Sequence, residues 1–248
     1  MKVSLVLIPV VLALFGCGSK ETTAKNNAPA PAPTYEADQA VFTEASRNLV
    51  NQFSRSLKSE LMAALNEGGA ARALRVCRVK APEIAAAHTK GGWSIKRVSD
   101  RMRNPDDRPI GDEGEILASF SDPDFKQDYY QDWYGSDSNK VFRYCQEIIT
   151  QPMCLQCHGD LQTIEPELYK QIKIAYVWDK ATGYKVGDVR GMFVVEAAWP
   201  EGRDVAQLLA SGVDIESLDS ALTDTADIPW DTTEDTTPAE DTIGDGNG

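Results

Sequence analysis

Histidine and, toward the C-terminus, basic residues are scarce in this chain of 248 residues. It contains two histidines, and from Asp204 to Gly248 it contains no lysine or arginine. So few histidines exclude a zinc site assembled from several imidazoles. Twelve acidic residues lie in the same C-terminal stretch, so the rest of the chain carries a formal net charge of −1 out of the total of −13. The folded part is therefore nearly neutral, and we expect no nucleic-acid partner.

Long apolar runs are absent except near the N-terminus, where Val3 to Phe15 is interrupted only by Ser4 and Pro9. We interpret residues 1–16 as a secretory signal peptide, because a basic Lys2 precedes a short apolar stretch. Leu14-Phe15-Gly16-Cys17 resembles the bacterial lipobox, which predicts a lipid on Cys17. The alternative is an ordinary cleaved signal in which this cysteine is incidental.

A lipid on Cys17 would anchor the mature protein to a bacterial membrane. Gly18 follows the cysteine where inner-membrane retention signals have Asp, so we expect the outer membrane, with the protein exposed to the periplasm or the cell surface. Residues 17–35 are small, polar and rich in Ala and Pro, which is typical of a tether.

Cysteine is sparse, with five residues, but two of them belong to a motif. Cys154-Leu155-Gln156-Cys157-His158 matches C-x-x-C-H, the attachment signature of a c-type haem. Two thiols three residues apart lie on one face of a helical turn and can add to the two haem vinyl groups. The next imidazole then lies under the iron as its proximal ligand. The sequence predicts one covalent haem c, anchored by Cys154 and Cys157 and ligated by His158.

Two other kinds of site use similar spacing. A thioredoxin-like redox pair follows a strand near the start of its domain, and this motif does not. A zinc site needs two more Cys or His ligands at suitable spacing, and His88 is the only other histidine. Haem is attached covalently outside the cytoplasm, so the export signal agrees with the haem interpretation.

The pattern between tether and tail predicts an α+β fold. Apolar spacing of three and four residues, with Gly and Pro punctuation, predicts helices at 38–66, 70–77, 83–89, 112–120 and 125–133. Alternation and β-branched composition predict strands at 93–99, 172–178 and 189–198, the last two forming a hairpin or two adjacent strands. We expect helices on an antiparallel sheet, preceded by a long N-terminal helix, within a domain at 36–203.

The acidic C-terminal region, residues 204–248, is predicted to be a largely disordered tail. Its first part, residues 205–222, has enough apolar residues for one or two short helices. The remainder is rich in Thr and Asp and lacks the apolar content of a packed core.

Four motifs in order resemble the PAS-like haem-c-binding domain family, whose members are stand-alone extracytoplasmic haem proteins or sensor regions of signalling proteins. The motifs are Val76-Cys77 with Ala81–Ala85, Ile95–Ser99 leading to Arg103–Pro105, Cys154–Gly159 and Gly183–Gly191. The resemblance covers Ala40 to Pro200 and implies a PAS-like sheet with flanking helices.

The resemblance also implies a second iron ligand, the cysteine at position 77. A thiolate is an anionic donor that favours ferric iron, so such a haem has a low reduction potential. Other possibilities remain open from the residues alone. They are a Cys77–Cys145 disulfide, an open sixth site, or ligation by His88, Met153 or Met192.

Arginines near the motifs are candidates to bind the haem propionates, because the guanidinium fork suits carboxylates. Arg97 and Arg103 fall within the motif Ile95–Pro105, where Arg101 also lies, and Arg190 lies in the late motif Gly183–Gly191. The competing interpretation is a solvated edge strand whose basic residues serve solubility.

Electron transfer is the function that these features favour, with a redox or signalling partner protein. The alternative is a haem-based sensor of redox state, NO or CO that acts through a partner. Enzyme activity is not expected, since only His88 could act as a distal histidine in peroxidase-like chemistry.

Overall fold

The structure, a computed structural model, describes residues 34–220. The predicted signal peptide, Cys17, nearly all of the tether and the end of the acidic tail lie outside the described residues. No helix among residues 34–220 has the length and apolar character needed to cross a membrane.

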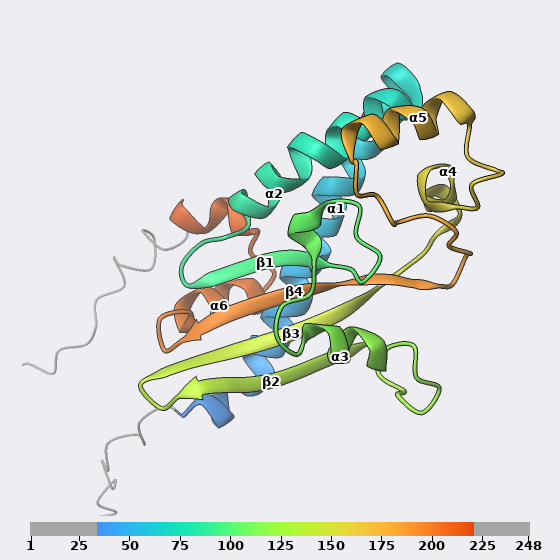
Figure 1. Cartoon of the computed structure of the whole chain (residues 1–248). Helices are drawn as coiled ribbons and strands as arrows, with labels where there is room; N and C mark the ends of the chain where they lie inside the picture. Colours follow the sequence, from blue (N-terminus) through green and yellow to red (C-terminus); the bar gives the residue numbers. More distant parts are fainter. Residues whose placement is uncertain (1–33, 221–248) are drawn as a thin grey trace, which may run out of the picture. The chain divides into compact units, whose positions relative to one another are not determined.

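A four-stranded antiparallel sheet with helices on both faces forms the folded domain (Figure 1). The strands lie in the order β1-β4-β3-β2 and are β1 (Trp93–Val98), β2 (Tyr129–Ser136), β3 (Asn139–Ile149) and β4 (Val189–Trp199). The helices are α1 (Tyr35–Arg75), α2 (Ala81–Ala87), α3 (Glu113–Ser119), α4 (Leu155–His158), α5 (Pro166–Ala175) and α6 (Arg203–Ala210). This α+β arrangement confirms the predicted fold class.

The long helix α1 begins where local chemistry favours it. Thr34 caps the first turn by accepting a hydrogen bond from the backbone N–H of Ala37 at 3.3 Å. Gly68 and Gly69 interrupt the helix, and Gly69 has φ +65°, a conformation that side chains with a Cβ rarely adopt. The double glycine therefore kinks the chain where the sequence predicted the first helix to end.

One face of the sheet forms the main hydrophobic core with α1 and α6. Inward residues at alternating strand positions meet the apolar side of α1, and the members include Phe42, Leu49, Phe53, Trp93, Phe142, Tyr144 and Val195. Gln52 on α1 accepts from the backbone N–H of Ile215 at 2.8 Å and donates to the carbonyl of Val213 at 3.0 Å.

These contacts join the start of the acidic region to the core. Val205, Leu209, Ile215 and Leu218 are buried with the α1 residues. The predicted domain boundary at residue 203 therefore falls inside the packed region, because the apolar side of α6 is buried against the core.

The opposite face of the sheet is partly covered by α3, which crosses it in Figure 1. A smaller core lies there, in which Cys145, Met192 and Val194 pack against Ile116 and Phe120. The remainder of this face is polar and carries a network of charges.

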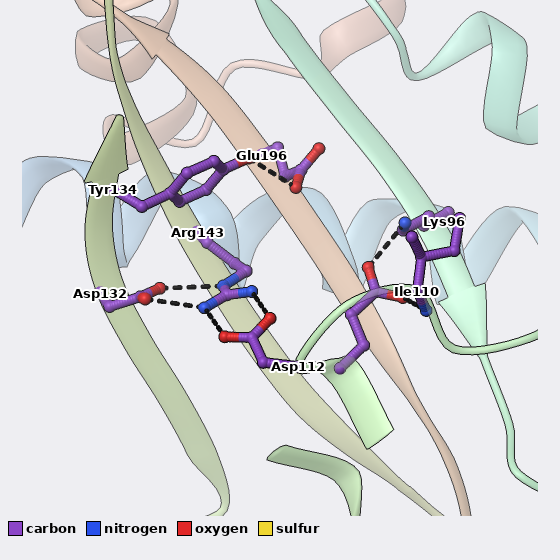
Figure 2. Close-up of polar contacts among 8 residues, drawn as sticks. Lys96, Ile110, Asp112, Asp132, Tyr134, Arg143 and Glu196 are labelled. Atoms are coloured by element: carbon purple, nitrogen blue, oxygen red, sulfur yellow. Dashed lines mark hydrogen bonds and ion pairs between the residues drawn. The ribbon is translucent and has the colours of Figure 1, made fainter. Parts of the chain in front are cut away.

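Arg143 lies at the centre of that network (Figure 2). Its guanidinium donates to both carboxylate oxygens of Asp112, at 2.6 and 2.9 Å, and to both of Asp132, at 2.9 and 2.7 Å. Lys96 on β1 forms a further ion pair with buried Glu113 at 2.6 Å. These bonds tie the N-terminal end of α3 to three strands.

Two predicted elements were wrong, and so was the strand pairing expected for one of them. Residues 125–133 were predicted to be helical, but Tyr129, Gln131 and Trp133 alternate with outward residues in β2. Residues 172–178 were predicted to be a strand, but Glu165 caps a helix there by accepting from the N–H groups of Glu167 and Leu168. Residues 172–178 therefore form neither a hairpin nor an adjacent strand with 189–198. Strand β4 pairs instead with β1 and with β3, a strand that was not predicted.

Leu209→Ala tests whether α6 is part of the fold. Leu209 is fully buried, so its truncation should lower the free energy of unfolding by about 2–5 kcal/mol in urea titrations. Gln207→Ala, on the exposed side of the same helix, is the matched control and should change it by less than about 0.5 kcal/mol. Equal effects would contradict the packing of α6.

Arg143→Leu should lower the free energy of unfolding by about 1–3 kcal/mol at neutral pH, because two facing carboxylates lose their shared partner. The Arg143 hydrogen bonds lower the pKa of Asp112, so their stabilisation is present at neutral pH and is lost as the pH falls through that lowered pKa. The difference in free energy of unfolding between wild type and Arg143→Leu should therefore decrease at acidic pH. Arg55→Leu, at an exposed α1 position, should show neither effect; a difference that does not change with pH would refute the ion-pair explanation.

Candidate functional site

Two adjoining hollows lie beyond the main core, near α4 and the second half of α1. Their volumes, counted with the space open to solvent at their mouths, are about 540 and 710 Å³. Both are lined by Cys77, Arg97, Arg103, His158 and Arg190, so the two together form one site, which we call the Cys77–His158 cavity. The fold brings together residues separated by more than a hundred positions in the sequence.

The two hollows differ in chemistry. The larger one is mainly apolar and is also lined by Leu57, Leu61, Leu65, Ala73, Leu74, Met153, Cys154, Gln156 and Cys157. The smaller one mixes polar and apolar surface and is also lined by Ser99, Arg101, Asn104, Asp107, Tyr176, Ala181 and Tyr184. The cavity thus combines apolar walls, chiefly in the larger hollow, with three arginines that line both hollows, which suits an amphipathic cofactor.

Helix α4 carries the C-x-x-C-H motif into the larger hollow. The turn Pro152–Cys154 precedes a single helical turn, Leu155–His158, which ends at Gly159. Both motif cysteines and His158 line the larger hollow, as the helical spacing predicted.

The imidazole of His158 is fixed by a backbone carbonyl. Its Nδ1 lies 2.8 Å from the oxygen of Ala181. A carbonyl oxygen only accepts, so Nδ1 must carry the proton, and Nε2 keeps the lone pair that a metal ion requires. Burial lowers the pKa of His158 well below its usual range, and the nearby charges of Arg103 and Arg190 lower it further. The neutral imidazole is therefore the form present at neutral pH.

The segment that follows α5 holds α4 in place. The backbone N–H groups of Gly183 and Tyr184 donate to the carbonyls of Gly159 and His158, at 2.6 and 3.0 Å. Arg103 donates from Nη2 to the carbonyl of Cys157 at 2.6 Å and from Nε to Asp179 at 3.0 Å. Arg103 therefore binds the motif backbone while it lines the cavity.

Cys77 reaches the cavity from an unusual helical turn. Residues Val76–Lys80 form a π-helical turn between α1 and α2, a local widening that often occurs at functional sites. The turn places Cys77 in the lining of both hollows, together with His158.

Most of the other candidates for the second iron ligand lie outside the Cys77–His158 cavity. Cys77 and Cys145 are both free, and Cys145 is fully buried in the small core under α3, so they form no disulfide. His88 is buried against Phe53 with Nδ1 2.8 Å from the oxygen of Ile84, and Met192 lies in the same core as Cys145. Met153 lines the larger hollow and remains beside Cys77.

Arg97 and Arg190 come from adjacent strands, β1 and β4, and reach the same cavity. The Nε atom of Arg190 is buried and has no hydrogen-bond partner within residues 34–220. A buried donor without a partner is costly, so this guanidinium is suited to an anionic ligand. The sequence placed Arg190 in the motif Gly183–Gly191, but neither its burial nor its missing partner is visible there.

Several lining residues escaped the sequence analysis. Leu57, Leu61 and Leu65 were recognised as part of an amphipathic helix, but their pattern resembles that of ordinary core residues. Ala181 was given no role in the site, since a backbone acceptor leaves no trace in side-chain chemistry. Among the described residues, no group of three or more His, Cys, Asp or Glu could hold a metal ion on its own.

The fold and the cavity define an α+β domain in which a C-x-x-C-H motif and a further cysteine, Cys77, line the same cavity. The sequence model of the Tll0287-like family (Tll0287) matches residues 20–198, and the chain belongs to this family. Among solved structures, the crystal structure of the cyanobacterial heme-protein Tll0287 aligns with 22% identity and a TM-score of 0.47, covering 68% of this chain and 99% of that chain. No curated protein matches the chain.

Cys145 should be unreactive in the folded protein. Burial raises the pKa of its thiol from 9.0 to about 12, which lowers the thiolate fraction at pH 7 on the order of 10³-fold. Iodoacetamide labelling followed by peptide mass spectrometry should modify Cys145 only after unfolding in urea. Rapid labelling of the native protein, or a Cys77–Cys145 linked peptide without reductant, would contradict its placement.

Proposed function

We propose that the protein is an extracytoplasmic, monohaem c-type haem-binding lipoprotein that takes part in electron transfer. The observation that carries the proposal is one cavity lined by Cys154, Cys157, His158 and Cys77. Membership of the Tll0287-like family supports haem binding, since a family member is described as a haem protein.

Covalent attachment is assigned to the α4 motif. Cys154 and Cys157 would form the thioether bonds, and Nε2 of His158 would be the proximal ligand. The hydrogen bond from Nδ1 to Ala181 supports this role, because it selects the tautomer with a free Nε2 lone pair and orients the ring.

The cavity fits a haem in two further respects. Leucines 57, 61 and 65 would pack against the macrocycle and exclude water from it. Arg97 and Arg190 would bind the propionates, and the unpartnered Nε of Arg190 supports this assignment. Arg103 also lines the cavity, although its Nε and Nη2 already bond to protein oxygens.

Cys77 is the proposed distal ligand. A bound haem would supply a one-electron ferric/ferrous couple at this site. The Cys77 thiolate would donate negative charge toward the iron and favour the ferric state, which sets a low reduction potential. Two protein ligands leave no open position for substrate, so electron transfer is favoured over enzyme chemistry.

The membrane location is part of the proposal. Cys17 would carry the lipid, and residues 18–33 would link it to the start of α1 at Tyr35. An outer-membrane anchor would leave the domain in the periplasm or at the cell surface, where a redox or signalling protein would be its partner.

Cys77→Ala tests the ligand assignment in protein matured by a bacterial c-type haem attachment system. The variant should keep its covalent haem, change its visible and ferric electron paramagnetic resonance spectra, and show a higher reduction potential. Cys145→Ala removes a thiol outside the cavity and is the matched control, which should leave all three unchanged.

Each part of the proposal has its own contradicting result. An unchanged spectrum in Cys77→Ala would refute the thiolate ligand, and Met153→Ala would then be the next variant to compare. Haem that is extracted by acidic acetone from the wild type would refute covalent attachment. Rapid CO binding by the reduced wild type, with loss of a protein ligand, would instead favour a gas sensor.

A further inference from the structure

We propose that Asp179 is a positioning residue that holds the His158 imidazole and, through it, sets the ferric/ferrous equilibrium of the haem. The inference rests on the proposed function. Asp179 does not line either hollow of the Cys77–His158 cavity, so its action must pass through other groups.

Asp179 is a buried carboxylate with two donors on a single oxygen. Its side chain is 1% exposed, and Oδ1 accepts from Arg103 Nε at 3.0 Å and from the backbone N–H of Ala181 at 3.0 Å. The carbonyl of that same Ala181 accepts the hydrogen bond from His158 Nδ1. Asp179 and the imidazole are therefore each hydrogen-bonded to the backbone of Ala181, so the carboxylate fixes the residue that positions the ring.

Arg103 provides a second path to the motif. Its Nη2 donates to the carbonyl of Cys157 at 2.6 Å and to that of Ala181 at 3.3 Å. The Asp179–Arg103 pair thus holds two backbone carbonyls of the site. One belongs to Cys157, the residue before His158, and the other is the Ala181 carbonyl that accepts the hydrogen bond from His158. The backbone N–H of Lys180 also donates to the carbonyl of Met102 at 3.1 Å, which joins the same two loops.

The buried Asp179–Arg103 ion pair has a higher energetic cost than an ordinary contact between loops. A buried ion pair loses hydration that its attraction only partly offsets, and Asp179 Oδ2 has no hydrogen-bond partner within residues 34–220. A turn alone could be built from neutral residues. The charge is explained if it neutralises Arg103, which would otherwise add an uncompensated cation beside the cavity.

Both paths predict that Asp179 lowers the reduction potential of the haem. A firm hydrogen bond from Nδ1 increases electron donation by the imidazole and favours ferric iron. An uncompensated Arg103 favours ferrous iron, because added positive charge at the cavity stabilises the state with one electron more. Loss of Asp179 should therefore raise the reduction potential through both.

Three variants of the haem-loaded full chain separate these contributions. In Asp179→Ala the ferrous-to-ferric ratio at a fixed ambient potential should rise on the order of tenfold, equivalent to about 59 mV for a one-electron couple, and the ferric resonance spectrum should change. Asp179→Asn keeps an oxygen acceptor, so it should give a smaller rise with wild-type resonance positions. Asp188→Asn is the control, because Asp188 accepts from the Lys185 N–H at 2.8 Å in the next turn but contacts neither Arg103 nor Ala181.

The outcomes that overturn the inference are distinct from failure of the proposed function. Asp179→Ala with covalent haem and wild-type potential and spectrum refutes it, as does an equal shift in Asp188→Asn. If Asp179→Ala does not fold, a wild-type reduction potential in Asp179→Asn is enough to refute the inference. A wild type without covalent haem contradicts the proposed function, and this inference with it.

Discussion

The apolar stripe of α1 is the constraint on which the rest of the domain depends. Its first half supplies Phe42, Leu49 and Phe53 to the main core, where alternating strand residues cover them. The same helical spacing continues to Leu57, Leu61 and Leu65, which form a wall of the cavity. One periodic pattern therefore stabilises the fold in one half and leaves an apolar surface for a ligand in the other.

Around that wall the functional groups come from short, irregular segments. A π-helical turn presents Cys77, a single turn of helix presents His158, and two strand ends present Arg97 and Arg190. The single turn α4 has little stability of its own, and backbone hydrogen bonds from Gly183 and Tyr184 hold it in place. The geometry of the site thus depends on the loop after α5 as much as on the motif.

Prediction from sequence succeeded where a local pattern decides the structure. The helix kink at Gly68-Gly69, strand β1, helix α3 and the cysteines and histidine of α4 all follow from short-range rules. It failed at residues 125–133 and 172–178, where short apolar runs satisfy either period and packing decides between them. It predicted short helices within residues 205–222 but placed the end of the domain at residue 203, because burial of their apolar side against α1 is a contact between distant segments.

By itself the sequence determined the α+β class and a Cys-Cys-His group with the spacing of one helical turn, because these depend on neighbouring residues. It left the partner of Cys77 open, since a disulfide with Cys145 and a place opposite His158 are equally compatible with composition. Only the tertiary structure decided that the sheet buries Cys145 beneath α3 while Cys77 shares a cavity with His158. It also revealed the bonds of Ala181 and Asp179, because contacts between distant loops and backbone atoms leave no pattern along the chain.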